Sequence, residues 1–489
     1  MSQILQMIQS HILEVVLLLL FVVEFVLLVI VLIRQKKLFQ ALKKLSAGTP
    51  TAPTTSTTPT APITPVKPPT STMSIPLATP VASPPKAVVP SKPTSRREQV
   101  LAAIRSIREV DDKTLASAME ELTAYFIKYA NGDYHQSLAS KDYYRLLDLQ
   151  HSPQMRVVVI GDNHCDFYAL AAVLLKLSVS DYDYFERATF VCLGDYLDRG
   201  GALFETQLLL KRLKEVLGER FILLRGNHEL VDFDEATHRF TSRVRPAQTS
   251  ECLNTYCSGN IEFLRQFARF HSTLPTYVFL KTSHKNVLLT HASIARDKYL
   301  SMYHMDAQSG EIVFESTVPT ESRLAMRNGI LKDMIWGDPR DCDEKMQFDS
   351  RFEYGRKQFE RFATRNHVSL LLRSHEEVAE GYKKFFGGCV ATLFSTGGKA
   401  NEQTGYPNVE PVFAVLCDGE LHIESCFVYD VCAASGPIAM NLFTNNRQDS
   451  RAVRDMLGDE FRCSWEKSQQ IIAAFKAARA AFPSETKTS

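Results

Sequence analysis

The sequence lacks a net charge of either sign, a cysteine framework and any evident internal repeat. Its 56 lysines and arginines are offset by 55 aspartates and glutamates, so the formal net charge at pH 7 is only +1. This balance gives no global electrostatic field that would favour nucleic acid as a partner. The 10 cysteines are scattered without a Cys-x-x-Cys pair, which is typical of free thiols in a reducing compartment and not of a disulfide scaffold.

The N-terminal region also lacks lysine and arginine in its first eleven residues, and a long apolar run follows them. Residues 12–33 (ILEVVLLLLFVVEFVLLVIVLI) are interrupted only by Glu14 and Glu24. The run is long enough for the roughly 20 residues that span a bilayer, and it lacks the basic start and small-residue cleavage site of a signal peptide. We therefore predict a short segment at 1–11 and a transmembrane helix at 12–33.

Basic residues begin directly after this run, at Arg34. The positive-inside bias predicts a single-pass membrane protein with its long C-terminal part in the cytoplasm. Glu24 lies near the middle of the predicted helix, where an unpaired carboxylate is unfavourable in lipid. The helix therefore either associates with itself or with a regulatory partner, or carries a protonated Glu24 without any partner.

The composition then divides the rest of the chain into three parts. Residues 34–95 are a basic juxtamembrane stretch followed by a Pro/Thr-rich stretch that cannot bury enough apolar surface to fold, so they predict a disordered linker. Residues 96–430 have the pattern of a folded globular domain, and residues 431–489 that of a helical C-terminal extension. Within the domain, residues 96–150 show helical spacing throughout.

A strand–loop–helix alternation begins at Arg156 and predicts an α/β fold whose loops gather at one end of the strands. The predicted strands lie at residues 156–160, 188–193, 221–224, 278–280, 287–290 and 368–372, and the predicted helices near 170–177 and 204–217.

Acidic residues, an asparagine and histidines follow these strands. Carboxylate and amide oxygens mixed with imidazole suit divalent ions such as Mn, Fe or Zn, and two such ions can act together on a phosphoryl group. The aspartates could instead cap the following helices, and single histidines could be structural. The residues concerned are Asp162, His164, Asp195, Asp198, Asn227, His228, His291 and His375.

Three longer motifs resemble the hallmark motifs of the PPP-family phosphoprotein phosphatases. They occur in the same order, each behind a predicted strand: Gly161-Asp-Asn-His164, Gly194-Asp-Tyr-Leu-Asp-Arg-Gly200 and Leu224-Arg-Gly-Asn-His-Glu229. Later stretches, Trp336-Gly-Asp-Pro339, Arg373-Ser-His-Glu376 and Phe394-Ser395, resemble further landmarks of that family. The resemblance implies a calcineurin-like metallophosphoesterase fold, a β-sandwich of mixed sheets flanked by helices, and a phosphoprotein substrate.

The resemblance also implies a role for each site residue. Asp162 and His164 would hold one divalent ion, Asp195 would bridge both ions, and Asn227, His291 and His375 would hold the second. A hydroxide bridging the ions would attack the phosphorus, and His228, oriented by Asp198, would protonate the leaving oxygen. Phosphate oxygens would be bound by Arg199 and Arg225. Arg351 is a further candidate, although the spacing around it departs from the family pattern.

The chain departs from the family after Phe394-Ser395, where a Pro-Asn-Tyr segment is usual and residues 396–406 read TGGKANEQTGY. This departure leaves the substrate class open between phosphoserine or phosphothreonine, which we favour, and phosphotyrosine or a small phosphoester such as a nucleotide. A membrane-tethered binding module without turnover is the alternative from another class.

Overall fold

The computed structural model describes residues 95–425, apart from 108–109, 131, 179, 349–350, 399–400 and 402–403. The predicted transmembrane helix at 12–33, almost all of the predicted linker and the predicted extension at 431–489 lie outside the described residues. Within the described part of the chain, no helix is long and apolar enough to cross a bilayer.

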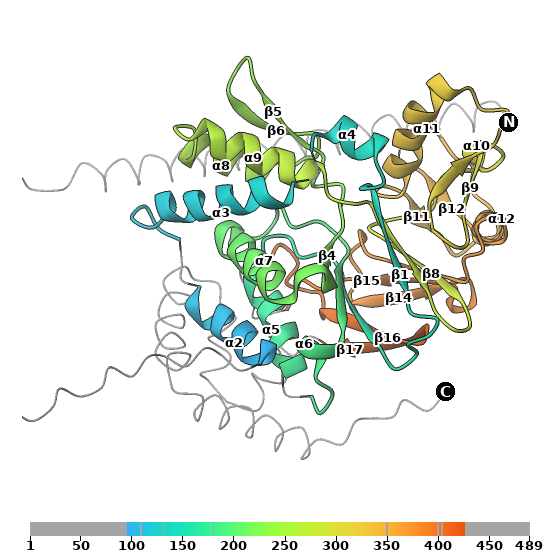
Figure 1. Cartoon of the computed structure of the whole chain (residues 1–489), viewed down its shortest axis with the longest axis horizontal. Helices are drawn as coiled ribbons and strands as arrows, with labels where there is room; N and C mark the ends of the chain where they lie inside the picture. The colour runs from blue at the N-terminus through green and yellow to red at the C-terminus, as the bar shows by residue number, and fades with distance from the viewer. Residues whose placement is uncertain are drawn as a thin grey trace, which may run out of the picture. The chain divides into compact units, whose positions relative to one another are not determined.

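Two mixed β-sheets form the centre of the domain (Figure 1). The six-stranded sheet has the order β1 (Tyr144–Asp148), β7 (Tyr277–Lys281), β8 (Asn286–Thr290), β13 (Leu370–Arg373), β15 (Val390–Leu393) and β14 (Tyr382–Phe385). The five-stranded sheet has the order β17 (Glu420–Ser425), β16 (Val412–Cys417), β2 (Arg156–Ile160), β3 (Thr189–Cys192) and β4 (Phe221–Leu223). Short pairs are β5 (Val231–Asp234) with β6 (Arg239–Ser242), β9 (Tyr303–Met305) with β10 (Ile312–Phe314), and β11 (Asp338–Pro339) with β12 (Glu353–Tyr354).

Alternating side chains of the strands explain how the sheets pack on each other. Val157 and Val159 of β2 lie in one buried cluster with Leu289 of β8 and Leu372 of β13, so the two sheets face each other across an apolar layer. The neighbouring side chains of β2 point away from that layer and pack against helices. This two-sided burial is the reason why the strands read as nearly continuous apolar runs.

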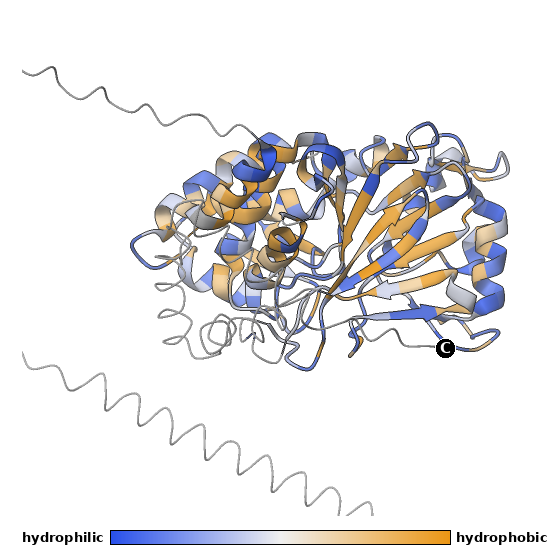
Figure 2. Ribbon diagram, turned by 90° about the horizontal axis from the view of Figure 1, so that it is seen from below, coloured by the Kyte–Doolittle hydropathy of each residue, from blue (hydrophilic) through white to orange (hydrophobic). Residues whose placement is uncertain are grey.

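Helices cover the outer face of each sheet. The outer face of the five-stranded sheet shares one buried apolar cluster with α2 (Arg96–Ser106), α3 (Leu115–Tyr129), α5 (Phe167–Ser178), α6 (Tyr184–Arg187), α7 (Leu203–Leu217), α8 (Gln248–Tyr256) and α9 (Ile261–Ser272). The six-stranded sheet packs against α4 (Tyr134–Ala139), α11 (Thr320–Asp333) and α12 (Arg356–Asn366). Shorter helices are α10 (Asp297–Leu300), η1 (Gly218–Arg220) and η2 (Phe386–Gly388). Figure 2 shows the strands as mainly hydrophobic and the outward sides of the helices as mainly hydrophilic, the pattern of amphipathic helices on a core.

The predicted fold class, a β-sandwich of mixed sheets flanked by helices, is confirmed for the described residues. The predicted strands and helices from Arg156 onward correspond to observed elements with bounds that differ by a few residues. The uniformly helical prediction for 96–150 is wrong at its end, because Tyr144–Asp148 forms β1 and pairs in parallel with β7. That pairing depends on a strand more than a hundred residues away, which local spacing does not reveal.

Candidate metal centre

The site lies where the carboxyl ends of strands from both sheets meet. Strands β2, β3 and β4 are parallel neighbours, so the loops that follow them emerge at one edge of the five-stranded sheet. Strands β8 and β13 are parallel neighbours in the other sheet and lead into His291 and His375. The bridge between Asp162 and Phe394 joins the two groups of loops.

Backbone strain is concentrated in these loops. A left-handed backbone is uncommon for residues other than glycine and gathers at functional sites, where surrounding contacts enforce it. The site residues in this conformation have φ values from 50° to 77°: His164, Cys165, Asp195, Asp198, Arg199 and His375.

Glu229 fastens two of the loops to each other. Its buried carboxylate accepts hydrogen bonds from the backbone N–H groups of Asp195, Tyr196 and Gly226, each at 2.8 Å. A Cβ atom on Gly226 would lie 2.1 Å from Oδ1 of Asp195, so only glycine permits this approach. Burial, followed by the nearby charge of Asp195, raises the pKa of Glu229 to about 7 against the effect of the three N–H groups.

Two groups of side chains could each hold a metal ion: His164, Asp195 and His228 in the first, and Asp195, His291 and His375 in the second. Asp162 lies beside the first group, because Nε2 of His164 lies 3.5 Å from Oδ2 of Asp162 and 3.5 Å from Oδ2 of Asp195. The Nδ1 of His164 lies 2.9 Å from the carbonyl oxygen of Leu197. If that nitrogen carries the proton, Nε2 is left as the ligand atom, a common arrangement at metal sites.

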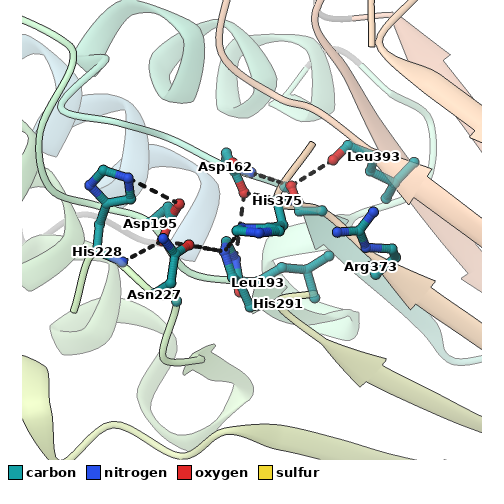
Figure 3. A network of polar contacts seen from close by, with 12 residues as sticks. Asp162, Leu193, Asp195, Asn227, His228, His291, Arg373, His375 and Leu393 are labelled. Carbon is teal, nitrogen blue, oxygen red and sulfur yellow. Dashed lines mark hydrogen bonds and ion pairs between the residues drawn. The ribbon is translucent and has the colours of Figure 1, made fainter. Parts of the chain in front are cut away.

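The second group surrounds the other oxygen of Asp195 (Figure 3). The Nε2 of His291 lies 3.4 Å from Oδ1 of Asp195, 2.8 Å from Oδ1 of Asn227 and 3.0 Å from Nδ1 of His375. The other ring nitrogen of His291 faces the carbonyl oxygen of Leu193 at 3.2 Å. Asp195 is therefore the one carboxylate shared by both groups, as a bridging ligand must be.

Two tests within the structure show that these side chains fit a pair of cations. First, Oδ2 of Asp162 and Nε2 of His375 are buried and have no hydrogen-bond partner among the described residues. Such orphaned buried atoms are uncommon and call for an ion or another partner. Secondly, the donor set of carboxylate and amide oxygens with imidazole nitrogens is the set that Mn, Fe and Zn share.

The pKa values show that the cluster attracts positive charge. Burial opposes protonation of His164, but the carboxylates of Asp162 and Asp195 outweigh it and raise the pKa of His164 to about 9. Burial likewise opposes ionisation of Asp195, but the charges of His291, His228 and His164 hold the pKa of that carboxyl well below its ordinary value. The carboxylates therefore stabilise a nearby cation, whether it is a proton or a metal ion.

His228, a member of the first group, forms a buried pair with Asp198. The Nδ1 of His228 lies 2.6 Å from Oδ2 of Asp198, while Nε2 lies 4.0 Å from Oδ2 of Asp195. A proton on Nδ1 leaves Nε2 directed toward the metal ligands. A carboxylate on the far side of the ring suits two roles: it orients a histidine that binds a metal ion, and it stabilises the charged imidazole of a proton donor.

The three arginines expected to bind phosphate differ in their surroundings. Arg225 is buried, Arg199 is half-buried, and Nε of each has no hydrogen-bond partner among the described residues. Arg351 is more exposed and its Nε lies 2.6 Å from Oδ2 of Asp338. It borders a hollow of about 520 Å³ lined by Asp338, Arg340, Lys345, Met346, Phe348, Arg351, Phe352 and Glu353.

Tyr406 was not predicted as a site residue. It lies in the segment 396–406, where the sequence departs from the family pattern. Its ring centroid lies 5.3 Å from that of His164 and 4.8 Å from that of Phe394, and its hydroxyl lies 3.4 Å from Nε2 of His164. Asp166 anchors the segment, because its Oδ2 accepts hydrogen bonds from Thr396 and Asn401 at 2.7 Å each. This loop thus brings an aromatic ring to the site without the Pro-Asn-Tyr segment. In the sequence, the only sign of this was that the loop contains a tyrosine.

Comparison with known proteins agrees with this geometry. Residues 155–378 match the sequence profile of the calcineurin-like phosphoesterases. This part of the chain is therefore similar to the calcineurin-like phosphoesterases. The match contains the loops after β2, β3, β4, β8 and β13, and therefore all the residues of both candidate metal groups.

The same part of the chain also resembles proteins that are described as serine/threonine-protein phosphatases. A probable serine/threonine-protein phosphatase of Encephalitozoon cuniculi is 28% identical over 49% of this chain and 46% of its own length. The serine/threonine-protein phosphatase 6 catalytic subunit of Caenorhabditis elegans is 32% identical over 49% of this chain and 64% of its own length. The matches thus span about half to two thirds of these relatives. A solved serine/threonine phosphatase structure from Saccharomyces cerevisiae aligns with a TM-score of 0.46 and 20% identity over 65% of this chain and 90% of that one.

Proposed function

We propose that the chain is a phosphoprotein phosphatase that hydrolyses phosphoserine and phosphothreonine with two divalent metal ions. The observation that carries the proposal is the position of Asp195 in both candidate metal groups, with the His228–Asp198 pair beside it. A structural cluster would have no reason to bury so many ionisable groups with unpaired ligand atoms.

The metal-holding roles follow from the two groups. Asp162, His164 and Asp195 would hold one ion, and Asp195, Asn227, His291 and His375 would hold the other. When bound, the ions would supply positive charge against the phosphoryl oxygens and lower the pKa of the attacking water.

The remaining side chains of the site bind the substrate and move a proton. The guanidinium groups of Arg199 and Arg225, whose Nε atoms have no hydrogen-bond partner in the described part of the chain, would donate to the phosphate oxygens. His228 would give the proton on Nε2 to the leaving oxygen, and Asp198 would keep the ring in the tautomer and orientation that this step needs. Arg351 would contribute from the edge of the site, where one of its nitrogens already pairs with Asp338.

Similarity to serine/threonine phosphatase catalytic subunits supports a phosphoprotein as substrate. The hollow next to Arg351 is consistent with a peptide flanking the phosphorylated residue, because exposed Met346 and Phe348 line it together with three cationic side chains.

Phosphate release from peptides tests the proposal. The full chain, purified in detergent and stripped of metal, would be assayed with phosphoserine, phosphothreonine and phosphotyrosine peptides with and without Mn²⁺. We expect release that depends on Mn²⁺, is abolished by Asp195→Asn and is fastest for phosphoserine or phosphothreonine. Release only from phosphotyrosine would change the substrate class, and no release from any peptide would contradict the proposal.

We further propose that the helix at 12–33 anchors the chain in a membrane, with the catalytic domain in the cytoplasm and the linker at 34–95 as a tether. The apolar run and the basic residues after it support this. Fractionation and protease protection of the tagged chain would test it. Release of the chain from membranes by high salt or alkaline carbonate would argue against an integral anchor.

A further inference from the structure

Arg225 has an aromatic neighbour that lies outside the matched part of the chain. The guanidinium carbon of Arg225 lies 4.5 Å from the centre of the Tyr134 ring. Tyr134 is the first residue of α4, which precedes residues 155–378 of the metallophosphoesterase match. The contact therefore joins the N-terminal helical segment to the arginine that directly precedes Gly226 and the candidate ligand Asn227.

Two contacts with α11 hold Tyr134 in this position. Its hydroxyl donates to Oδ1 of Asn328 on α11 at 2.5 Å. Further along α4, the carbonyl oxygen of Leu138 accepts a hydrogen bond from Arg327 of the same helix α11 at 2.8 Å. The backbone of Arg225 is fixed as well, since its N–H donates to the carbonyl oxygen of Pro275 at 2.7 Å. The ring and the arginine are thus set against each other by separate parts of the fold.

An aromatic ring suits an arginine that must bind an anion. A carboxylate would orient the guanidinium group but would also neutralise it and occupy its N–H donors. The face of a ring attracts the cation and restricts its orientation while leaving the donors at the edge of the group available. Arg225 is 6% exposed and its Nε has no hydrogen-bond partner among the described residues, as this arrangement requires.

We infer that Tyr134 is a positioning residue for phosphate binding: it holds the guanidinium group of Arg225 in the orientation that receives the phosphate of the substrate. The inference rests on the proposed function for the role of Arg225. It makes α4, from the segment before the matched domain, a part of the substrate site.

Paired variants of the full chain test this role. Tyr134→Leu removes the ring, and Tyr134→Phe keeps the ring and removes only the hydroxyl. The control Tyr182→Leu removes another cation–π contact, in which the guanidinium carbon of Arg156 lies 4.1 Å from the centre of the Tyr182 ring. Arg156 is at the start of β2, and the candidate metal centre is at the other end of that strand. We expect Tyr134→Leu to raise both KM for a phosphopeptide and the inhibition constant of inorganic phosphate by about 3-fold to 30-fold. We expect kcat to change less than about twofold, because binding of substrate and transition state weaken together. Tyr182→Leu should behave like the unmodified chain, whereas Tyr134→Phe, which keeps the ring and loses the contact with Asn328, should show a smaller rise than Tyr134→Leu.

A double-mutant cycle separates positioning from general stability. In an Arg225→Ala background, Tyr134→Leu should cause no further change in the inhibition constant of phosphate, because there is no guanidinium group left to orient. A Tyr134→Leu effect that persists in this background would overturn the inference, as would an unchanged inhibition constant in the single variant. Thermal unfolding of each variant checks folding, and Tyr134→Met, of similar length and without a ring, replaces Tyr134→Leu if that variant does not fold.

The inference and the proposed function can fail separately. If the unmodified chain shows no metal-dependent turnover, the proposed function fails, while calorimetric titration of the Mn²⁺-loaded chain with inorganic phosphate still compares Tyr134→Leu with the unmodified chain. If turnover is present and both proteins bind phosphate equally, only the role of Tyr134 is wrong.

Discussion

The imidazole of His228 is held by Asp198 through the 2.6 Å contact between Nδ1 and Oδ2. The carboxylate is itself fixed, because its Oδ1 accepts the backbone N–H of Thr249 at 2.7 Å, while the N–H of Asp198 donates to the Thr249 hydroxyl at 2.8 Å. Both side chains are buried. The ring therefore has one defined orientation, with Nε2 toward the candidate metal ligands.

The first prediction concerns this pair. Asp198→Asn replaces the acceptor with an amide that no longer stabilises the charged imidazole. We expect kcat to fall about 10-fold to 1,000-fold, because general acid catalysis contributes roughly 100-fold to 10,000-fold and His228 itself remains in place. KM for the phosphopeptide should change little. Steady-state kinetics measure this, with Asp181→Asn, an exposed aspartate, as the matched control. An unchanged kcat would mean that His228 does not donate the proton.

The second prediction concerns the metal ions and is read from stability instead of turnover. Ions that bind only the folded chain raise its midpoint of thermal unfolding. We expect Mn²⁺ to raise the midpoint by several degrees after removal of metal with a chelator, and we expect Asp195→Asn to lose most of this rise because both groups lose a shared ligand. Asp112→Asn, a substitution on the surface, should keep it. A full rise in the Asp195→Asn protein would count against a shared metal centre.

The third prediction concerns Tyr406, which covers the His164 side of the site. Tyr406→Leu removes the ring and should lower kcat/KM for the phosphopeptide about 3-fold to 10-fold, the effect expected for a lost aromatic contact. Tyr406→Phe keeps the ring and should retain most of the activity. Tyr256→Leu, in a side chain that is 65% exposed on α8, is the control. Equal losses for the Phe and Leu variants would assign the effect to the hydroxyl group.

The candidate metal residues could be predicted because each lies within a few residues of the end of a strand. Once β2, β3 and β4 are recognised as parallel neighbours, the residues at their carboxyl ends must converge. Tyr134 and Tyr406 could not be found in this way. Tyr134 reaches Arg225 only through the packing of α4 on α11, and Tyr406 reaches His164 only because Asp166 holds its loop. Such contacts depend on tertiary packing and leave no local spacing in the sequence, as was also the case for β1.

The last prediction concerns His271, a buried histidine to which we assign no catalytic role. It lies on α9, stacks on Phe267 with ring centroids 4.3 Å apart, and its Nδ1 lies 2.8 Å from the carbonyl oxygen of the same residue. Its Nε2 lies 3.2 Å from the side chain of Gln207, whose Nε2 is buried without a partner in the described structure. A reversed Gln207 amide would donate to the ring and satisfy both groups, which fits a neutral imidazole.

Burial lowers the pKa of His271 from 6.5 to about 4, against the weaker opposing effect of the Phe267 carbonyl. The unfolded chain therefore binds a proton at this position between these pH values and the folded chain does not. Stability from the neutral ring is fully present above pH 6.5 and is lost as the pH falls toward 4, by up to roughly 3 kcal/mol in the free energy of unfolding. Since other groups titrate in the same window, the quantity to measure is the difference between the unmodified chain and His271→Gln in denaturant unfolding at several pH values. We expect this difference to shrink as the pH falls. His135→Gln, at an exposed histidine on α4, should have the same stability as the unmodified chain at every pH. If the stability of His271→Gln changed with pH in parallel with that of the unmodified chain, the ring of His271 would not be held neutral.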